Sequence, residues 1–322
     1  MEPTAANTYR RDVRAWLLVE ASKAGVVRIA SAAASAQPRL ASVRQIDVDN
    51  VPTFTDILQR YARDEGVALS GLRCAVVIAG AATGESISLV RSRWTISRAG
   101  LTAVFGSPPV ILNDVAARAW GISSGTATIE SLRGHGRPCF TRPGRYGLIM
   151  VDEGVGAAIV DVDRDLGVRV LETESGHMDF APGGAAEERL AAAVGGPAAV
   201  VSWEKMLMLD WQDPVWRAAC PEISESARPL MLARMLGRFT VNLMHSFGAW
   251  QGVMMTGARG GRIVEGRNLV EFESEFIKRR VFSRLIGTAP VWRVDQHDAV
   301  LAGAAERLAH DLRVESGFLA AA

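Results

Sequence analysis

The stretch YGLIMVDEGVGAAIVDV at residues 146–162 decides the fold that the sequence predicts. Residues 146–151 and 157–162 are two apolar runs, each about as long as a β-strand. Between them, residues 152–156 (Asp-Glu-Gly-Val-Gly) combine polar side chains with two glycines, which is typical of a turn. The stretch therefore predicts a β-hairpin, and a further apolar run at residues 168–171 predicts a third strand after it.

The same order of elements occurs near the start of the chain. Strands are expected at residues 16–19 and 26–29, with a turn at 22–25 between them and a third strand at 42–49. Two halves that each open with a hairpin and continue with helices indicate an internal duplication, which predicts two α/β domains with a cleft between them. Further strands are expected at residues 74–78, 110–112, 252–255 and 289–293, loops at 122–146, and helices at 55–65, 115–120, 184–194, 203–209, 226–249, 273–286 and 299–312.

The composition excludes several classes of function. The chain has 322 residues, which is enough for two domains, and its 36 basic and 35 acidic residues give a net charge of +1. Because the basic residues are scattered along the chain, the sequence predicts neither a nucleic acid nor an anionic membrane as a partner. No apolar stretch approaches the ~20 residues that a membrane-spanning helix needs.

The three cysteines, Cys74, Cys139 and Cys220, are odd in number and far apart, and no CxxC pair occurs. This spacing indicates neither a zinc site nor a disulfide framework. Reduced thiols and a cytoplasmic location are therefore expected. The apolar run at residues 15–19 is also too short for the core of a signal peptide.

The most informative polar segment is Glu174–Pro182, which reads ESGHMDFAP. Glu174 and His177 lie on one tight loop, and Gly176 lets the main chain approach a ligand closely. Such a pair can hydrogen-bond adjacent hydroxyl groups of a sugar. Two alternatives stay open. One is a loop in which His177 satisfies main-chain groups, and the other is a metal site that also includes Asp179. No further ligand pair at helical spacing supports the metal site.

A second polar position ends a predicted strand at Ile111–Asp114, which reads ILND. Ligands of α/β sheets bind beyond the carboxyl ends of the strands. A carboxylate at Asp114 can therefore serve as a general base that takes the proton of a hydroxyl group. The alternative is that Asp114 caps the helix that follows.

With these segments in this order, the sequence resembles the bacterial glucokinase family, within the actin-like ATPase and hexokinase fold. The segments that carry the resemblance are Cys74–Gly80, Trp94–Ser97, Ile111–Asp114, Glu174–Pro182, Ser202–Glu204, Gly237–Leu243, Gly252–Gly257 and Leu301–Ala305. The resemblance implies an α/β fold with a smaller domain at residues 15–119 plus 299–322, a larger domain at residues 120–298, and a sugar-binding cleft between the two.

The resemblance also implies a reaction and its residues. Asn113, Glu174, His177 and Glu204 would hydrogen-bond the hydroxyl groups of a hexose, with glucose as the first candidate. Asp114 would accept the proton of the 6-hydroxyl as this group attacks the γ-phosphorus of ATP, and Mg²⁺ would accompany the nucleotide. A homodimer is usual in the family, although no other feature of the sequence indicates one.

The first phosphate loop departs from the family pattern. That pattern, Asp-x-Gly-Gly-Thr, corresponds here to Glu20–Gly25, which reads EASKAG. In the family the glycines let main-chain N–H groups reach phosphate oxygens, and the aspartate organises Mg²⁺. Here Glu20 could replace the aspartate and Lys23 could add a positive charge, but the paired glycines are lost.

The second phosphate loop, Gly-Thr-Gly-x-Gly in the family, corresponds to Asp152–Gly156, named here the phosphate turn. Gly154 and Gly156 remain, whereas Asp152 and Glu153 bring two carboxylates to an anionic ligand. A like-charge pair at ~4 Å costs about 1 kcal/mol in water and ~4 kcal/mol at an effective dielectric of 20. Weak binding of ATP is therefore expected.

The adenosine segment, Thr256–Gly261, departs less from the family pattern. It keeps Gly257, and Arg259 could contact a phosphate. Two functions of different class follow from the whole pattern. One is a hexose kinase with unusual phosphate loops, and the other is a sugar-binding protein without turnover. Main-chain N–H groups that converge on an open phosphate position would favour the kinase, whereas Glu153 in that position would favour the binding protein.

Overall fold

The computed structural model describes residues 15–23, 25–41, 43–48, 51–89, 92, 94–165, 167–196 and 200–321, the last five as main chain only. Residue 24 of the predicted turn and residues 42 and 49 of the predicted third strand lie outside the described residues. The chain forms two compact units. Unit 1 comprises Met1–Ala117 and Val300–Ala322, and unit 2 comprises Arg118–Ala299.

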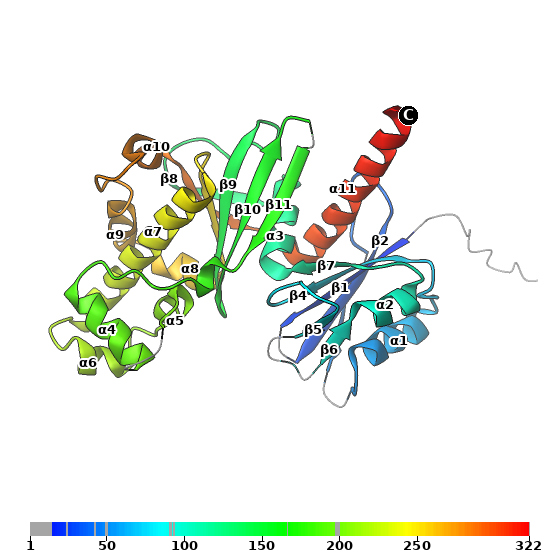
Figure 1. The fold of residues 1–322 in the computed structure, drawn as a ribbon, viewed down its shortest axis with the longest axis horizontal. Coiled ribbons are helices and arrows are strands. Elements are labelled where there is room, and N and C mark those ends of the chain that lie inside the picture. Colours follow the sequence, from blue (N-terminus) through cyan, green and yellow to red (C-terminus); the bar gives the residue numbers. More distant parts are fainter. Residues whose placement is uncertain are drawn as a thin grey trace, which may run out of the picture. The chain divides into compact units, whose positions relative to one another are not determined.

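Unit 1 is built on a five-stranded sheet in the order β3-β2-β1-β4-β7 (Figure 1). Its strands are β1 (Ala15–Lys23), β2 (Val26–Ala33), β3 (Arg44–Asp47), β4 (Arg73–Ile78) and β7 (Val110–Asn113). The first three are antiparallel neighbours, which confirms the predicted N-terminal hairpin, and β4 and β7 continue the sheet parallel to β1. The other elements are α1 (Phe54–Glu65), β5 (Ser86–Ser88), β6 (Thr95–Ser97), α2 (Arg98–Phe105) and α11 (Ala299–Ala321). The helix α3 (Asp114–Ser123) begins in unit 1, and its residues from Arg118 onward belong to unit 2.

Side chains of β1 alternate between two cores, because successive residues of a strand point to opposite faces of the sheet. Leu17 and Val19 belong to the core that includes buried side chains of α1 and α2. Trp16 and Leu18 belong to the core that includes buried side chains of α11. The helix from the far end of the chain therefore covers one face of the N-terminal sheet.

Unit 2 is built on a six-stranded sheet in the order β11-β10-β9-β12-β13-β8. Its strands are β8 (Thr128–Arg133), β9 (Gly144–Val151), β10 (Val155–Asp163), β11 (Gly167–Thr173), β12 (Val253–Thr256) and β13 (Val291–Asp295). Val155 lies opposite Val151 in the antiparallel pair β9–β10, so the predicted hairpin at residues 146–162 is confirmed. The strand β12 is parallel to β9, which places the carboxyl ends of these two strands at the same edge of the sheet.

Unit 2 has one large hydrophobic core, to which all helices that lie wholly within the unit, except the short η1 and η2, contribute side chains. These helices are η1 (Ser175–His177), α4 (Ala185–Gly195), α5 (Trp203–Leu207), α6 (Val215–Ala219), η2 (Glu225–Ala227), α7 (Arg228–Phe247), α8 (Ala258–Ile263), α9 (Asn268–Ser274) and α10 (Ser283–Thr288). Within the described residues, none of the helices has both the length and the apolar character that a bilayer crossing requires.

Two predictions about secondary structure are wrong. Residues 122–146 contain a strand, β8, which pairs with β13 at the edge of the sheet and has no fully buried side chain, so it shows no apolar alternation. The single helix expected at residues 273–286 is two helices, α9 and α10, with a non-helical segment between them. Phe282, at the end of this segment, has φ 61°, a left-handed conformation that a continuous right-handed helix excludes.

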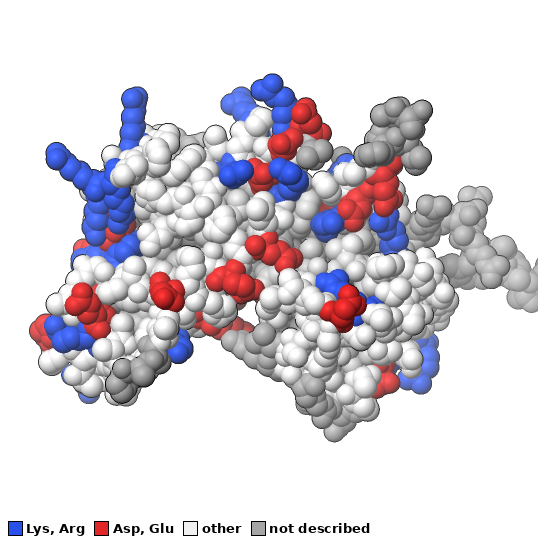
Figure 2. Space-filling view, in the orientation of Figure 1, with Lys and Arg blue, Asp and Glu red and all other residues white. Residues whose placement is uncertain are grey.

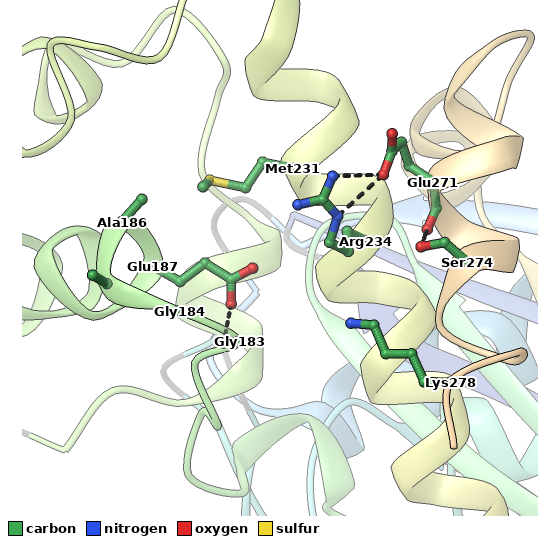
Figure 3. A pocket seen from close by; sticks show the side chains of 10 residues that line it. Gly183, Gly184, Ala186, Glu187, Met231, Arg234, Glu271, Ser274 and Lys278 are labelled. Carbon is green, nitrogen blue, oxygen red and sulfur yellow. Dashed lines mark hydrogen bonds and ion pairs between the residues drawn. The ribbon is translucent and has the colours of Figure 1, made fainter. Parts of the chain in front are cut away.

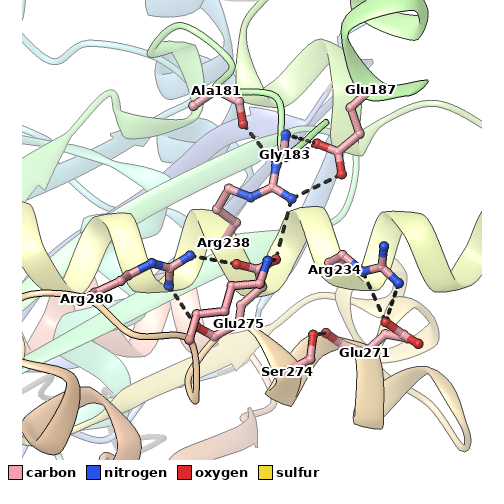
Figure 4. A network of polar contacts seen from close by, with 10 residues as sticks. Ala181, Gly183, Glu187, Arg234, Arg238, Glu271, Ser274, Glu275 and Arg280 are labelled. Atoms are coloured by element: carbon pink, nitrogen blue, oxygen red, sulfur yellow. Dashed lines mark hydrogen bonds and ion pairs between the residues drawn. The ribbon is translucent and has the colours of Figure 1, made fainter. Parts of the chain in front are cut away.

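A buried ionic network ties α4, α7 and the segment after α9 (Figure 4). Arg238 of α7 lies between two buried carboxylates, with Nη1 2.6 Å from Glu187 Oε2 and Nη2 3.5 Å from Glu275 Oε1. The fully buried Glu275 is also paired with Lys278 and, at 2.7 Å, with Arg280. Three cations therefore surround one carboxylate that has no access to solvent.

Candidate functional site

The predicted sugar loop begins with one turn of 3₁₀ helix, η1, directly after β11. Glu174 and His177 are 49% and 59% exposed, and His177 Nε2 lies 3.7 Å from Glu174 Oε2, beyond a hydrogen bond. Among the described residues, the His177 ring makes no hydrogen bond to the main chain, which contradicts the alternative of a loop closed by this histidine. Both polar groups are therefore accessible to a ligand.

Gly176 fixes this turn against the start of β10. A Cβ atom at position 176 would overlap the carbonyl oxygen of Val155, so only glycine permits this contact. Val155 is also part of the phosphate turn. The sugar loop and the phosphate turn of unit 2 are therefore in direct main-chain contact.

This contact leads to a prediction for Gly176→Ala. We expect the free energy of unfolding to fall by about 1–3 kcal/mol, because the added methyl group has no space. Hexose affinity should fall as well, since the loop must move away from β10. Gly184→Ala is the matched control, because a Cβ atom there meets nothing within 4 Å and its φ of 164° is extended backbone. Denaturant unfolding and calorimetric titration with glucose measure both effects, and equal behaviour of the two variants would contradict the argument.

Glu204 lies beside the same loop and contacts the phosphate turn. It is the second residue of α5, and the N–H of Trp203 donates to the carbonyl oxygen of Met178 at 3.0 Å, so α5 starts next to the sugar loop. Glu204 Oε2 accepts the N–H of Val155 at 2.8 Å. Unit 2 therefore brings Glu174, His177 and Glu204 together around the phosphate turn.

Two N–H groups of the phosphate turn already have partners. The N–H of Asp152 donates to the carbonyl oxygen of Gly154 at 3.0 Å, and the N–H of Val155 donates to Glu204. The side chains of Asp152 and Glu153 are exposed. Glu204, a residue that the sequence assigned to the sugar, is thus also a hydrogen-bond partner of the turn.

The predicted adenosine segment lies against this turn at the end of β12. Gly257 has φ 95°, and a Cβ atom there would overlap the carbonyl oxygen of Val151, so the approach requires glycine. Gly156 pairs with Met150 across the hairpin. Gly154, Gly156 and Gly257 therefore lie at the carboxyl ends of β9 and β12, the edge at which α/β sheets bind ligands.

Arg259 does not occupy the position that the sequence suggested. Its side chain is buried, Nε donates to the carbonyl oxygen of Leu207 at 3.0 Å, and Nη2 donates to that of Leu209. The guanidinium group therefore fastens α8 to the end of α5. Because its donors are engaged by main-chain oxygens, we remove Arg259 from the phosphate-binding set.

In unit 1, Asn113 and Asp114 have different roles at the start of α3. Asn113 Oδ1 accepts the N–H groups of Val115 and Ala116 at 2.8 and 3.3 Å, and Nδ2 donates to the carbonyl oxygen of Gly80 at 3.1 Å. Asn113 therefore caps the helix, and the alternative that Asp114 caps it is wrong. Asp114 is the first residue of α3 and is half-buried, at an end of the helix that favours negative charge.

Glu20 does not fit the role of a Mg²⁺ ligand. It is 2% exposed, Oε2 lies 2.7 Å from Arg28 Nη1, and Oε1 accepts the hydroxyl of Ser22 at 3.1 Å. A carboxylate with both oxygens bonded and its charge paired is a poor ligand for a hard cation. Lys23 is exposed at the end of β1. In the part of the chain that the structure describes, no cluster of three His, Cys, Asp or Glu side chains could hold a metal ion.

A separate pocket of about 510 Å³ lies between the start of α4 and the helices α7 and α9 (Figure 3). It is lined by Gly183, Gly184, Ala185, Ala186, Glu187, Met231, Arg234, Glu271, Ser274 and Lys278. Arg234 in its wall is paired with Glu271 at 2.6 Å. None of the predicted sugar or phosphate residues lines this pocket, so it is distinct from the arrangement around the phosphate turn.

Known proteins are similar to this chain in sequence and in fold. The glucokinase family model matches residues 24–208 and 216–311. The glucokinase of Stenotrophomonas maltophilia (strain K279a) is 25% identical over 296 residues, which cover 82% of this chain and 85% of the relative. The structure of Balamuthia mandrillaris glucokinase in complex with glucose matches with a TM-score of 0.70 at 17% identity, covering 94% of this chain and 95% of that one. A glucokinase from an Antarctic psychrotroph gives 0.69 at 18% identity, covering 92% and 98%.

These similarities settle the fold class and the family. The solved glucokinases share the α/β fold of the hexokinase type, as the sequence predicted. The family model extends over most of the chain, including the sugar loop, the phosphate turn and the adenosine segment. The chain therefore belongs to the glucokinase family, a family of sugar kinases.

Proposed function

We propose that this chain binds a hexose, glucose foremost, and transfers the γ-phosphoryl group of ATP to the 6-hydroxyl of the sugar. The observation that carries the proposal is the position of the Asp114 carboxylate. Asp114 follows the end of β7 and is the first residue of α3, the helix that Asn113 caps. Membership of the glucokinase family and the glucose bound by a solved relative support it.

In the proposed reaction Asp114 accepts the proton of the 6-hydroxyl, and the oxygen forms a bond to the γ-phosphorus. The bond between this phosphorus and the bridging oxygen breaks, and ADP leaves with the electron pair. The N-terminus of α3 stabilises the negative charge of Asp114 before the proton arrives. Protonation of Asp114 at the moment of attack then makes the sugar oxygen a stronger nucleophile.

Sugar recognition is proposed to rest on Glu174, His177 and Glu204 of unit 2, together with Asn113. Within the described residues, Glu204 Oε1 makes no hydrogen bond, so this oxygen can accept a sugar hydroxyl while Oε2 holds the phosphate turn. A site built from such groups rejects analogues that lack one hydroxyl, because its polar atoms would then be left unpaired. In this proposal Glu204 therefore hydrogen-bonds both the sugar and the phosphate turn.

A second candidate function is hexose binding without phosphoryl transfer. The observation in its favour is the bond from the Val155 N–H to Glu204, which fills one of the donors that phosphate would use. The ion pair between Glu20 and Arg28 also favours binding without phosphoryl transfer, because it engages the carboxylate that would replace the aspartate of the family. Because these residues do not fit the Mg²⁺–phosphate arrangement of the family, we assign no residue to Mg²⁺.

One experiment separates the two candidates. The purified chain is incubated with γ-labelled ATP, Mg²⁺ and a panel of hexoses, and its melting temperature is measured with each sugar. Labelled sugar phosphate, formed with glucose and not with a 6-deoxy hexose, supports the kinase. A melting temperature raised by glucose, without labelled product at high protein concentration, supports the binding protein. Absence of both effects contradicts both candidates.

A further inference from the structure

The segment Ile277–Leu285, named here the basic–apolar patch, exposes large apolar side chains. Ile277 is 76% exposed, Val281 73%, Phe282 56% and Leu285 45%. Single exposed apolar residues are normal on protein surfaces, whereas a cluster within nine residues indicates a contact surface. The patch lies outside the sugar loop and the phosphate turn, and Lys278 is its one residue that lines the 510 Å³ pocket, so none of these explains the exposed apolar side chains.

The patch is held in place at both ends. Phe276 before it and Ile286 after it are buried, at 0% and 1% exposure, in the core of unit 2. Within the patch, Arg280 donates to the main-chain oxygen of Glu275 at 2.7 Å and to its Oε2 at 2.7 Å. The apolar side chains therefore stand on a segment that is anchored to the interior.

Residues of α7 and of the turn after it contact the patch. His245 Nε2 lies 3.1 Å from the carbonyl oxygen of Val281. The ring of Phe282 packs at 5.6 Å, between centroids, from the ring of Trp250. These contacts use the main chain of Val281 and part of the Phe282 ring, and they leave the apolar side chains facing solvent.

The patch is also strongly basic, although the whole chain has a net charge of only +1. It contains Lys278, Arg279, Arg280 and Arg284 and no acidic residue. Lys278 and Arg280 pair with the buried Glu275 just before the patch, so Arg279 and Arg284 carry its uncompensated charge. Arg279 and Arg284 are exposed, and the side chain of neither forms an ion pair or hydrogen bond with any other described residue. Figure 2 shows Lys and Arg side chains projecting over the region of α9 and α10.

The sequence as a whole predicts no membrane partner, because its charges balance, but this segment gathers four cations beside exposed apolar side chains. We propose that the basic–apolar patch docks the protein on an anionic phospholipid surface. Apolar side chains can enter the interface of a bilayer while neighbouring cations bind lipid phosphates, and each cation strengthens the attraction to an anionic leaflet. A second copy of the chain would bring like charges together. A stable contact with another protein takes about 20–30 residues per partner, whereas the patch has nine.

The test is co-sedimentation of the full chain with vesicles of phosphatidylcholine alone and of phosphatidylcholine with phosphatidylserine. We expect binding only to the anionic vesicles, weakened by added salt. Arg279→Glu combined with Arg284→Glu should lower the binding constant about tenfold or more. Val281→Asp should lower it as well, because it removes an apolar side chain and adds a negative charge.

Matched controls lie elsewhere on the surface. Val200→Asp changes a residue that is 67% exposed outside the patch, and Arg137→Glu reverses an exposed charge, so neither should alter vesicle binding. The proposal is overturned if anionic vesicles bind no protein, if neutral vesicles bind equally, or if the controls lose as much as the patch variants. It is also overturned if sedimentation velocity shows a dimer that Val281→Asp dissociates. If Val281→Asp does not fold, the variant that combines Arg279→Glu with Arg284→Glu decides the test, because its loss of vesicle binding does not depend on Val281→Asp.

Discussion

Replacing Asp114 by Asn is expected to lower kcat for hexose phosphorylation by about 10²- to 10⁴-fold, the usual effect of losing a general base. An amide has the shape of the carboxylate but cannot accept the proton of the 6-hydroxyl. The fold should survive, because Asn113 and not Asp114 caps α3. Glucose binding should therefore remain measurable by calorimetry while turnover is lost.

Asp56→Asn is the matched control for this variant. Asp56 is also a carboxylate in the first turn of a helix of unit 1, where it accepts the N–H of Thr53 at 3.0 Å in a capping box. Its replacement should alter stability slightly and leave kcat unchanged. Equal kcat values for Asp114→Asn and the unaltered protein would remove Asp114 from the role of base.

Replacing Arg238 by Met is expected to lower the free energy of unfolding by about 3–5 kcal/mol, the cost of breaking a buried ion pair by removing one partner. The change leaves Glu187 without its 2.6 Å partner and takes one of three cations from Glu275. Denaturant unfolding near neutral pH measures the loss. Arg234→Met is the control one turn earlier on α7. Arg234 is 43% exposed and paired with Glu271, so its loss should cost at most about 1 kcal/mol.

The ion pairs around Glu275 also predict how the stability lost in Arg238→Met depends on pH. Burial alone would raise the pKa of Glu275, but the hydrogen bonds from Lys278 and Arg280 and the charge of Arg238 outweigh it and hold the pKa below its usual value. A carboxyl whose pKa is depressed by folding stabilises the protein above its unfolded pKa, and this contribution is lost as the pH falls through the folded value. Arg238→Met should therefore be most damaging near neutral pH, and a gap that stays constant under acid would contradict this assignment.

Local sequence was sufficient for much of the fold. The hairpin at residues 146–162 follows from two apolar runs and a glycine-containing turn, all within seventeen residues. The edge strand β8 was missed because its side chains have no buried face and hence no alternation. The break between α9 and α10 was missed because it depends on how Arg280 and Phe282 meet the rest of unit 2, which no local period records.

Local sequence could likewise predict some contacts of the candidate site and not others. The partner of Glu20 could have been found, because Arg28 lies opposite it in the register of the predicted hairpin, and opposite charges there attract. The bond between Glu204 and the Val155 N–H joins residues 49 positions apart, and its partner is a main-chain group that every sequence possesses. Resemblance to a family assigns Glu204 to the sugar, and only the folded chain shows its second attachment.

The buried network around Glu275 has a consequence for the response of unit 2 to temperature. The hydration of charged groups becomes less favourable on heating, so the penalty for keeping the buried charges of Glu187, Arg238 and Glu275 away from water decreases. The stabilisation from apolar burial, by contrast, levels off in the same range. The ion pairs that join α4, α7 and the segment after α9 should therefore contribute relatively more to the stability of unit 2 at high temperature. At low temperature their relative contribution should be smaller.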